Sequence, residues 1–149
     1  ARQLGVRLAS HDDATESHVA EALADGVSIA EFPTTREAAQ AAHANGLAVL
    51  MGAPNVVRGK SHSGNISASD VASGGHLDVL SSDYVPSSLL PAAFRLAETV
   101  DGMGIPQAVQ LITLKPARAV GLVDRGAIEE GFRADLVQVR LVNDHPVVR

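Results

Sequence analysis

Short apolar segments alternate with segments of helical spacing four times along this 149-residue chain. Such alternation predicts βαβ units, in which successive strands of one sheet are parallel. The third apolar segment, residues 47–51, is apolar throughout, as expected of a strand covered on both faces. The four expected strands are residues 4–10, 27–32, 47–51 and 76–82.

Capping patterns mark where the expected helices begin. A polar side chain that accepts a backbone N–H bond precedes each helix, and an acidic residue three positions later forms a capping box. The candidates are Asp13 or Thr15 for the first helix, Thr34 with Glu37 for the second, and Ser67 with Asp70 after the third strand. A further helix is expected over 86–100.

The pattern changes after residue 101. We expect a helix with Pro106 near its start, a break at Pro116 and one short further turn. The tail from residue 124 is β-like and alternates in part, so it is expected to leave the parallel sheet and form a small sheet of its own.

Composition excludes several classes of function. With 12 Lys and Arg against 17 Asp and Glu, the net charge is −5, which argues against general binding of nucleic acid or of anionic membranes. The absence of cysteine excludes disulfides and thiolate metal sites, and fits a cytoplasmic protein. The chain opens without Met, directly before an expected buried strand, so we expect a fragment of a longer protein.

Polar residues gather just after the expected strands. The carboxyl ends of parallel strands meet at one edge of a sheet, where such folds place their chemistry. The pattern therefore predicts an active-site face. Its members are His11, Asp12 and Asp13, then Glu31, then residues 55–65, then Asp83 and Tyr84.

The triplet His11-Asp12-Asp13 has two interpretations. An imidazole beside carboxylates can bind a metal ion or exchange protons. Alternatively, Asp12 or Asp13 caps the following helix and the histidine is incidental. The residues alone leave both open.

Two single carboxylates are further candidates. Asp83, at the end of a buried strand, is expected to be poorly solvated and to need a metal, a cation or backbone donors. Its structural alternative, capping the helix near Ser87, places it about four residues too early. Glu31 is held near its strand end because Pro33 prevents an immediate helix, although taken by itself it is better explained as a polar loop residue.

The loop over residues 56–70 has the composition of a phosphate-binding loop. Gly59 and Gly64 allow close backbone approach, and Arg58 and Lys60 supply positive charge. A flexible surface loop is the alternative. Further donors are Ser61, His62, Ser63 and Asn65. The other histidines are expected to be unremarkable: His18, His43 and His145 at the surface, and His76 at the amino end of its strand.

Several segments together resemble the PhnM family of phosphonate metabolism, within the amidohydrolase superfamily of metal-dependent hydrolases. Two stretches, "GAPNVVRGKSHSGN" and "SSDYVP", are specific to that family, whereas the tail "KPARAVGL…RGAIEEGFRADLV" is widespread in the superfamily. The resemblance extends over essentially the whole chain. The segments are "LASHDDAT", "AEFPTT", "MGAPNVVRGKSHSGNISA", "LSSDYVPSSLL" and "TLKPARAVGLVDRGAIEEGFRADLVQV".

The resemblance implies the carboxyl-terminal half of a (β/α)8 barrel over residues 1–120, followed by a β-sandwich segment over residues 121–149. The implied reaction is hydrolysis of α-D-ribose 1-methylphosphonate 5-triphosphate to the 5-monophosphate and pyrophosphate. The phosphorylated ribose phosphonate would be the substrate, and a divalent metal the cofactor. Zinc is expected first, with manganese, iron or nickel as alternatives.

The same resemblance assigns roles to residues. Asp83 matches the aspartate of the eighth barrel strand, which binds metal and takes a proton from the attacking water, and His11 matches the metal-binding histidine of the fifth. Glu31 stands where the sixth strand usually has a histidine. The substrate-binding residues would be Arg58, Lys60, Ser61, His62, Ser63, Asn65, Asp12 and Tyr84.

The chain lacks the first four barrel strands and the histidine pair of the first. Half a barrel exposes strand edges, so we expect the isolated chain to be inactive and to self-associate or bind the missing half. Two other functions remain open: an amidohydrolase that acts on C–N bonds, and a non-catalytic phosphate-binding half-barrel. The cationic loop argues against the first, because a neutral nucleobase needs no such charge.

Overall fold

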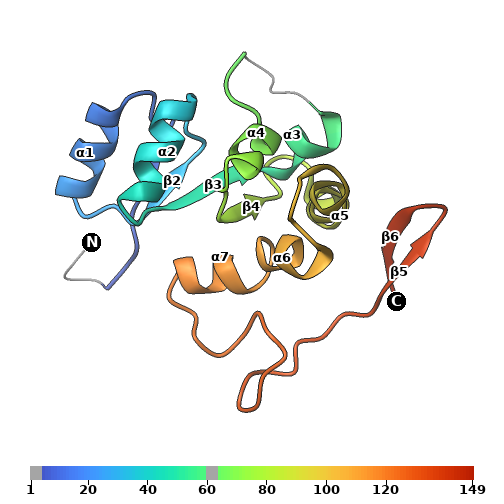
Figure 1. Ribbon diagram of the computed structural model, residues 1–149. Helices are drawn as coiled ribbons and strands as arrows, with labels where there is room; N and C mark the ends of the chain where they lie inside the picture. Colours follow the sequence, from blue (N-terminus) through green and yellow to red (C-terminus); the bar gives the residue numbers. More distant parts are fainter. Residues whose placement is uncertain (1–4, 60–63) are drawn as a thin grey trace.

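The protein, described here from a computed structural model of residues 5–59 and 64–149, contains a four-stranded parallel sheet in the order β1-β2-β3-β4 (Figure 1). The strands are β1 (Ala9–His11), β2 (Ile29–Glu31), β3 (Ala48–Gly52) and β4 (Val79–Ser81). Consecutive strands are neighbours and helices connect them, which is the arrangement of half a (β/α)8 barrel. The predicted fold class is confirmed. Lys60, Ser61, His62 and Ser63 lie outside the described residues.

The connecting helices begin close to where the sequence predicts. They are α1 (Glu16–Ala24), α2 (Arg36–Ala44), α3 (Ala53–Arg58), α4 (Ala68–Ser73), the 3-10 turn η2 (Pro86–Ser88) and α5 (Leu89–Thr99). Thr15 caps α1 by accepting from the His18 N–H, so the alternative in which Asp12 or Asp13 caps this helix is wrong. The prediction that Ser67 caps a helix is confirmed, since its hydroxyl accepts from the Asp70 N–H at the start of α4. No helix in the described ranges is long and apolar enough to cross a bilayer.

Three local predictions are wrong. Thr35, not Thr34, caps α2, and Glu37 instead accepts a hydrogen bond from the backbone of Glu16. Residues 53–58 form α3, so Arg58 ends a helix rather than lying within a loop. The break that the sequence places at Pro116 comes earlier, between α6 (Ile105–Gln110) and α7 (Leu114–Ala119). Pro116 lies in the first turn of α7, where a proline is tolerated.

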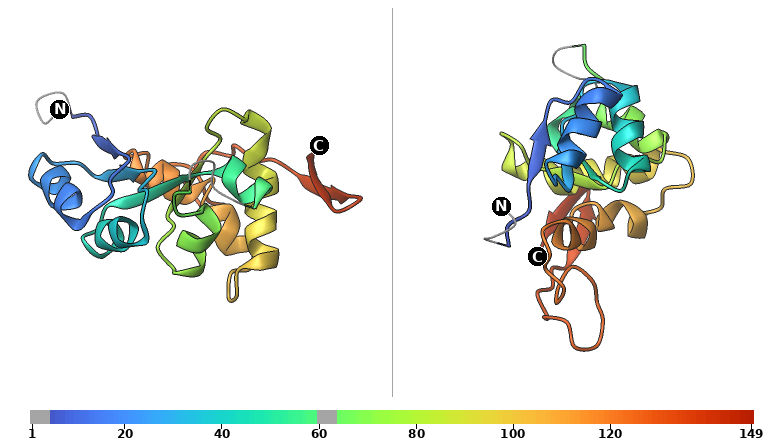
Figure 2. Two further views of the ribbon diagram at one scale, coloured as in Figure 1. Left: turned by 90° about the horizontal axis from the view of Figure 1, so that it is seen from above. Right: turned by 90° about the vertical axis from the view of Figure 1, so that its left-hand side faces the viewer.

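Small side chains set the packing between the helices and the sheet. Ala38, Ala39 and Ala42 on α2 are fully buried, which allows that helix to lie close to the strands. Larger side chains fill the rest of the core, chiefly Val49, Met51, Val56, Leu96 and Leu111. Figure 2 shows α1, α2 and α4 along one face of the sheet.

The two edges of the sheet differ. β1 is exposed at Ala9 and His11, and within the described residues no backbone hydrogen bond reaches its outer side. At the other edge, the Leu80 N–H donates to the Leu111 carbonyl at 2.9 Å, so the segment between α6 and α7 partly covers β4. The prediction of exposed edges therefore holds for β1 and only in part for β4.

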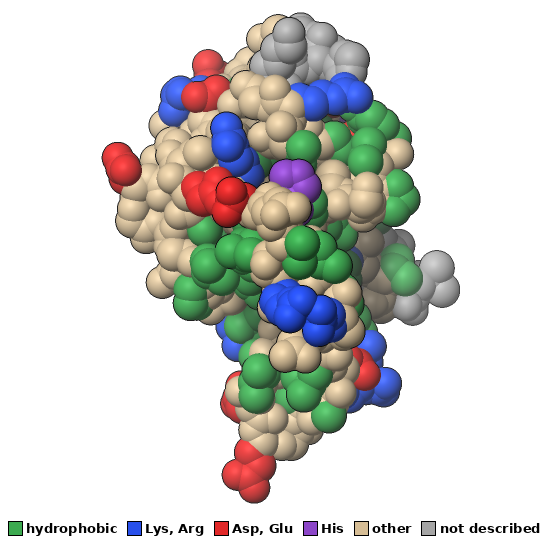
Figure 3. Space-filling view, turned by 90° about the vertical axis from the view of Figure 1, so that its right-hand side faces the viewer, with side chains coloured by type: hydrophobic (Ala, Val, Ile, Leu, Met, Phe, Trp, Pro, Cys, Tyr) green, Lys and Arg blue, Asp and Glu red, His purple; other side chains and the backbone are tan. Residues whose placement is uncertain are grey.

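After α7 the chain runs away from the sheet to an antiparallel hairpin of β5 (Val139–Val142) and β6 (His145–Val148) (Figure 1). Asn143 and Asp144 join the strands with φ of 49° and 63°, as a two-residue type I′ turn requires. This small separate sheet matches the prediction for the tail. Apolar side chains gather on the face that carries the hairpin (Figure 3), Leu141 and Val148 among the exposed ones. The boundary at residue 120 stays a prediction.

We expect Leu96→Ala to lower the free energy of unfolding by about 2–5 kcal/mol, because it removes a fully buried side chain and leaves a cavity. Leu136→Ala, at a position that is 64% exposed, is the matched control and should cost less than about 0.5 kcal/mol. Urea denaturation of both variants measures the difference. Equal losses would show that the core is not where the structure places it.

Asp124 closes the loop that follows α7. Hydrogen bonds from Arg125, at 2.9 Å, and from Arg133, at 2.7 Å, lower the pKa of its carboxyl group from 3.8 to about 2. Because the folded-state pKa is depressed, the stabilisation is complete above pH 4 and is lost as the pH falls toward 2.

We expect Arg125→Gln to move the NMR titration midpoint of the Asp124 carboxyl group back toward 3.8, since it removes the larger cause of the shift. Arg140→Gln, an exposed change on β5, should leave the midpoint near 2. A midpoint that stays low in Arg125→Gln would contradict the assigned cause.

Candidate active site

The carboxyl edge of the sheet brings three predicted residues to one side of the molecule. His11 ends β1, Glu31 ends β2, and Asp83 follows β4 by two residues. His11 and Glu31 are register partners, and His11 Nε2 lies 3.9 Å from Glu31 Oε2. The other ring nitrogen, Nδ1, lies 3.2 Å from Oδ2 of Asp12. The imidazole is thus held between two carboxylates.

Left-handed backbone conformations occur just past three of the four strand ends. The φ angles are 59° at Asp12, 53° at Phe32 and 50° at Asp83. Such angles are uncommon for residues with a Cβ and cost free energy, so they persist only where the surroundings enforce them. Strain of this kind clusters at functional sites, and here it turns the chain sharply at the edge that carries the candidate residues.

Backbone hydrogen bonds join the loops at this edge into one unit. The Thr34 N–H donates to the Asp13 carbonyl at 2.8 Å, and the Ile66 N–H donates to the Thr34 carbonyl at 3.0 Å. Asp13 itself is buried, and its carboxylate accepts from the Ser10 hydroxyl at 2.5 Å. Asp13 therefore helps to hold these loops together.

Asp83 is exposed, so the expectation of a poorly solvated carboxylate is wrong. β4 ends at Ser81, and the following turn carries Asp83 beyond the covered part of the sheet. The carboxylate reaches across to the end of β3, where a Cβ on Gly52 would lie 3.2 Å from its Oδ2. A glycine at position 52 leaves room for Asp83 over the strand end.

Two of the predicted substrate-binding residues are brought together. The Arg58 guanidinium lies 5.5 Å from the centre of the Tyr84 ring, within cation–π range. Asp12 lies beside His11, whereas Asn65 is exposed with no side-chain contact described.

The donors at this edge suit a divalent metal ion, but the set is partial. Zinc bonds to nitrogen and oxygen ligands of about 2.0–2.2 Å place two ligands of one ion at most about 4.4 Å apart. His11 and Glu31 meet this limit. Within residues 5–59 and 64–149, no group of three or more His, Cys, Asp or Glu side chains is close enough to hold an ion.

A second polar cluster, at the opposite end of the strands, was not predicted. Asp78 precedes β4, and its carboxylate contacts His43 at 3.0 Å and Lys115 at 3.1 Å. His43 is therefore half-buried and paired, not a plain surface residue. The only signal in the sequence is an aspartate inside an otherwise apolar strand segment, Leu77-Asp78-Val79.

The half-barrel and its polar carboxyl edge define the class of protein. Residues 1–148 match the model of the amidohydrolase family, and the chain belongs to that family. The chain is also 58% identical, over 141 residues, to the alpha-D-ribose 1-methylphosphonate 5-triphosphate diphosphatase of Escherichia coli (strain K12). The match covers 94% of this chain but only 37% of the relative's length. No solved structure gives a significant match.

We expect Asp83→Gly to leave the free energy of unfolding unchanged or to raise it by up to about 1 kcal/mol, since glycine adopts positive φ without a Cβ penalty. Asp83→Val should lower it by about 1–2 kcal/mol, because a β-branched residue resists the left-handed conformation. Thermal denaturation of the pair checks this. A glycine variant less stable than the valine variant would refute strain at this position.

Proposed function

We propose that this chain supplies the carboxyl-terminal half of the active site of a metal-dependent hydrolase. The reaction is release of pyrophosphate from α-D-ribose 1-methylphosphonate 5-triphosphate. The placement of His11, Glu31 and Asp83 at the same carboxyl edge of the sheet carries the proposal. The Escherichia coli relative is named for hydrolysis of this triphosphate, which supports the choice of substrate.

In this proposal His11 and Glu31 would supply two ligands of a divalent cation, with zinc first and manganese, iron or nickel as alternatives. Asp83, at the same edge, would be a third ligand only if it came closer to this pair than it lies in the described structure. When bound, such an ion lowers the pKa of a coordinated water toward neutrality. Asp83 accepts the proton of the attacking water, a role that its exposed carboxylate allows. Asp12 orients the His11 ring through Nδ1, which leaves Nε2 directed to the Glu31 side.

Substrate binding falls to the segment after β3. Arg58 and Lys60 offset negative charge on the departing pyrophosphate, and Ser61, His62, Ser63 and Asn65 donate hydrogen bonds to phosphate oxygens. The ring of Tyr84 holds the Arg58 side chain in place. A planar guanidinium can then grip two oxygens of one phosphate group.

A second candidate is favoured by the incomplete donor set. The described residues hold no three-donor cluster, so the 149-residue chain alone would be a non-catalytic, phosphate-binding half-barrel. We propose that it becomes active only when the exposed β1 edge is paired, either with the remainder of a barrel or in a homo-oligomer. A cytoplasmic location is part of the same proposal.

The test replaces the matching segment of the Escherichia coli relative with this chain and measures pyrophosphate release from the ribose triphosphate phosphonate. We expect turnover in the chimera and none in the 149-residue chain alone. Asp83→Asn should lower kcat by about 10²–10⁴-fold, because an amide cannot accept the proton of water. It should also reduce bound metal, measured by elemental analysis.

Asp101→Asn is the matched control, since Asp101 is an exposed carboxylate away from the sheet edge, and it should retain full activity and metal content. Retention of kcat in Asp83→Asn would disprove the assigned role. A chimera that releases ammonia from nucleobases but no pyrophosphate from the phosphonate would favour a C–N hydrolase instead.

A further inference from the structure

Phe32 lies at the candidate active site without belonging to the core. It follows β2 directly, after Glu31, and its side chain is half-buried. Among the described residues it is neither in the buried core cluster nor among the partly buried side chains that pack against that cluster. Its ring instead lies against the imidazole of His11, with the ring centres 5.5 Å apart and the planes at 86°. Aromatic pairs favour this edge-to-face arrangement.

The backbone of Phe32 adopts the left-handed conformation, with φ of 53°. A bulky residue is an uncommon occupant of this region, which glycine enters without a Cβ penalty. Asp12, in the matching position after β1, has φ of 59°. The Phe32 N–H donates to the Leu50 carbonyl at 2.9 Å, and the Asp12 N–H to the Glu31 carbonyl at 3.1 Å. Two matched turns thus bring both side chains to the imidazole of His11.

The His11 side chain is 58% exposed, so the surrounding core does not fix its ring. The last torsion of a histidine side chain has only a broad preference, and an exposed imidazole samples several orientations. Asp12 contacts Nδ1 at 3.2 Å, but its own side chain is 60% exposed. This contact fixes one atom of the ring and leaves the plane of the ring free to turn.

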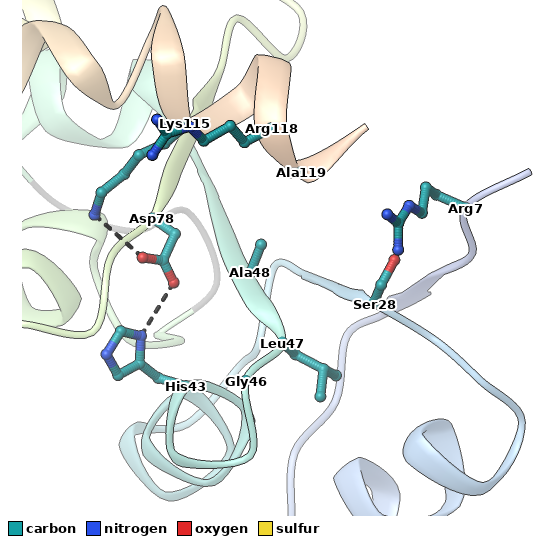
Figure 4. A pocket seen from close by; sticks show the side chains of 10 residues that line it. All are labelled: Arg7, Ser28, His43, Gly46, Leu47, Ala48, Asp78, Lys115, Arg118 and Ala119. Atoms are coloured by element: carbon teal, nitrogen blue, oxygen red, sulfur yellow. Dashed lines mark hydrogen bonds and ion pairs between the residues drawn. The ribbon is translucent and has the colours of Figure 1, made fainter. Parts of the chain in front are cut away.

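The pair of His43 and Asp78 shows how a carboxylate can hold an imidazole more firmly (Figure 4). Asp78 contacts His43 Nδ1 at 3.0 Å and is itself held by Lys115 at 3.1 Å. Asp12 forms no second ion pair within residues 5–59 and 64–149. The orientation of the His11 ring therefore depends on a further contact.

We propose that Phe32 is a positioning residue, whose ring holds the His11 imidazole with Nε2 facing Glu31. The distance of 3.9 Å from Nε2 to Oε2 of Glu31 is too long for a hydrogen bond, so this pair does not fix the ring by itself. Phe32 fixes the plane of the imidazole, and Asp12 fixes which nitrogen faces outward. A side chain already held in its binding orientation loses less freedom when a ligand arrives. The effect on turnover rests on the proposed function, whereas the orientation of the ring does not.

The first test is NMR of the 149-residue protein in buffer with EDTA, which needs neither metal nor substrate. We expect nuclear Overhauser effects between the rings of His11 and Phe32. At one alkaline pH, the nitrogen chemical shifts of His11 should show a proton on Nδ1 and none on Nε2. Phe32→Leu should bring the two shifts closer together, because the ring then exchanges between tautomers. Phe32→Tyr keeps an aromatic ring and should restore the separation.

Phe132→Leu is the matched control, since it makes the same change at a half-buried ring in the tail, and it should leave the His11 shifts unchanged. Phe32→Gly separates positioning from stability. Glycine tolerates the left-handed backbone, so a smaller separation of the shifts in this variant would come from the missing ring. Unchanged His11 shifts in both Phe32→Leu and Phe32→Gly, or no Overhauser effect between the two rings, would overturn the inference.

The second test measures turnover in the chimera. Phe32→Leu should lower kcat by about 3- to 10-fold and leave KM within about 2-fold, because Phe32 acts through His11 and does not bind substrate. Phe32→Tyr should recover most of the lost rate. A raised KM with unchanged kcat would make Phe32 a substrate-binding residue and contradict positioning. A chimera with no turnover would refute the proposed function alone, because the NMR measurement decides the role of Phe32 without it.

Discussion

The parallel pairing of β1 with β2, of β2 with β3 and of β3 with β4 is the constraint on which the rest of the structure depends. The strands are only three to five residues long, so backbone hydrogen bonds alone give each pair little stability. Helices packed through alanines such as Ala38 and Ala42 hold the strands in register. That register places His11 beside Glu31, and a shift of one residue would turn one of these side chains to the opposite face.

The amino end of the sheet carries paired charges that stabilise the fold, whereas the carboxyl end carries the candidate catalytic residues. At the amino end, Asp78 is satisfied by His43 and Lys115, and the charges are paired. At the carboxyl end, Asp12 and Asp83 adopt strained backbone conformations, and the side chains stay exposed. Barrel enzymes keep their reactive groups at the carboxyl end because loops there can vary without disturbing the strands. Among the described residues next to the parallel strands, non-glycine residues with positive φ occur at the carboxyl end, which agrees with that division.

The sequence predicted the alternation of strands and helices well, because apolar periodicity and caps such as Ser67 with Asp70 are local signals. It also predicted that His11, Glu31 and Asp83 would share one edge, since parallel strands leave no other arrangement. It failed where tertiary contacts decide: the exposure of Asp83 follows from a turn beyond β4, and the pairing of His43 with Asp78 joins residues 35 positions apart. The proposed substrate rests on the resemblance to a family and on the relative's name, because no spacing of residues could give it.

The exposed edge of β1 and the partial metal site have the same explanation. A catalytic zinc site takes about three protein ligands and a water. Among the described residues of this edge, His11 and Glu31 approach within the distance that one ion can bridge, whereas Asp83 follows β4, two strands beyond β2. His11 lies on the strand whose outer side has no backbone partner in the described part of the chain. A strand that paired there would bring its own carboxyl end next to His11. Completion of the sheet and completion of the metal site would then be a single event, and for this reason we expect metal affinity and activity to appear together.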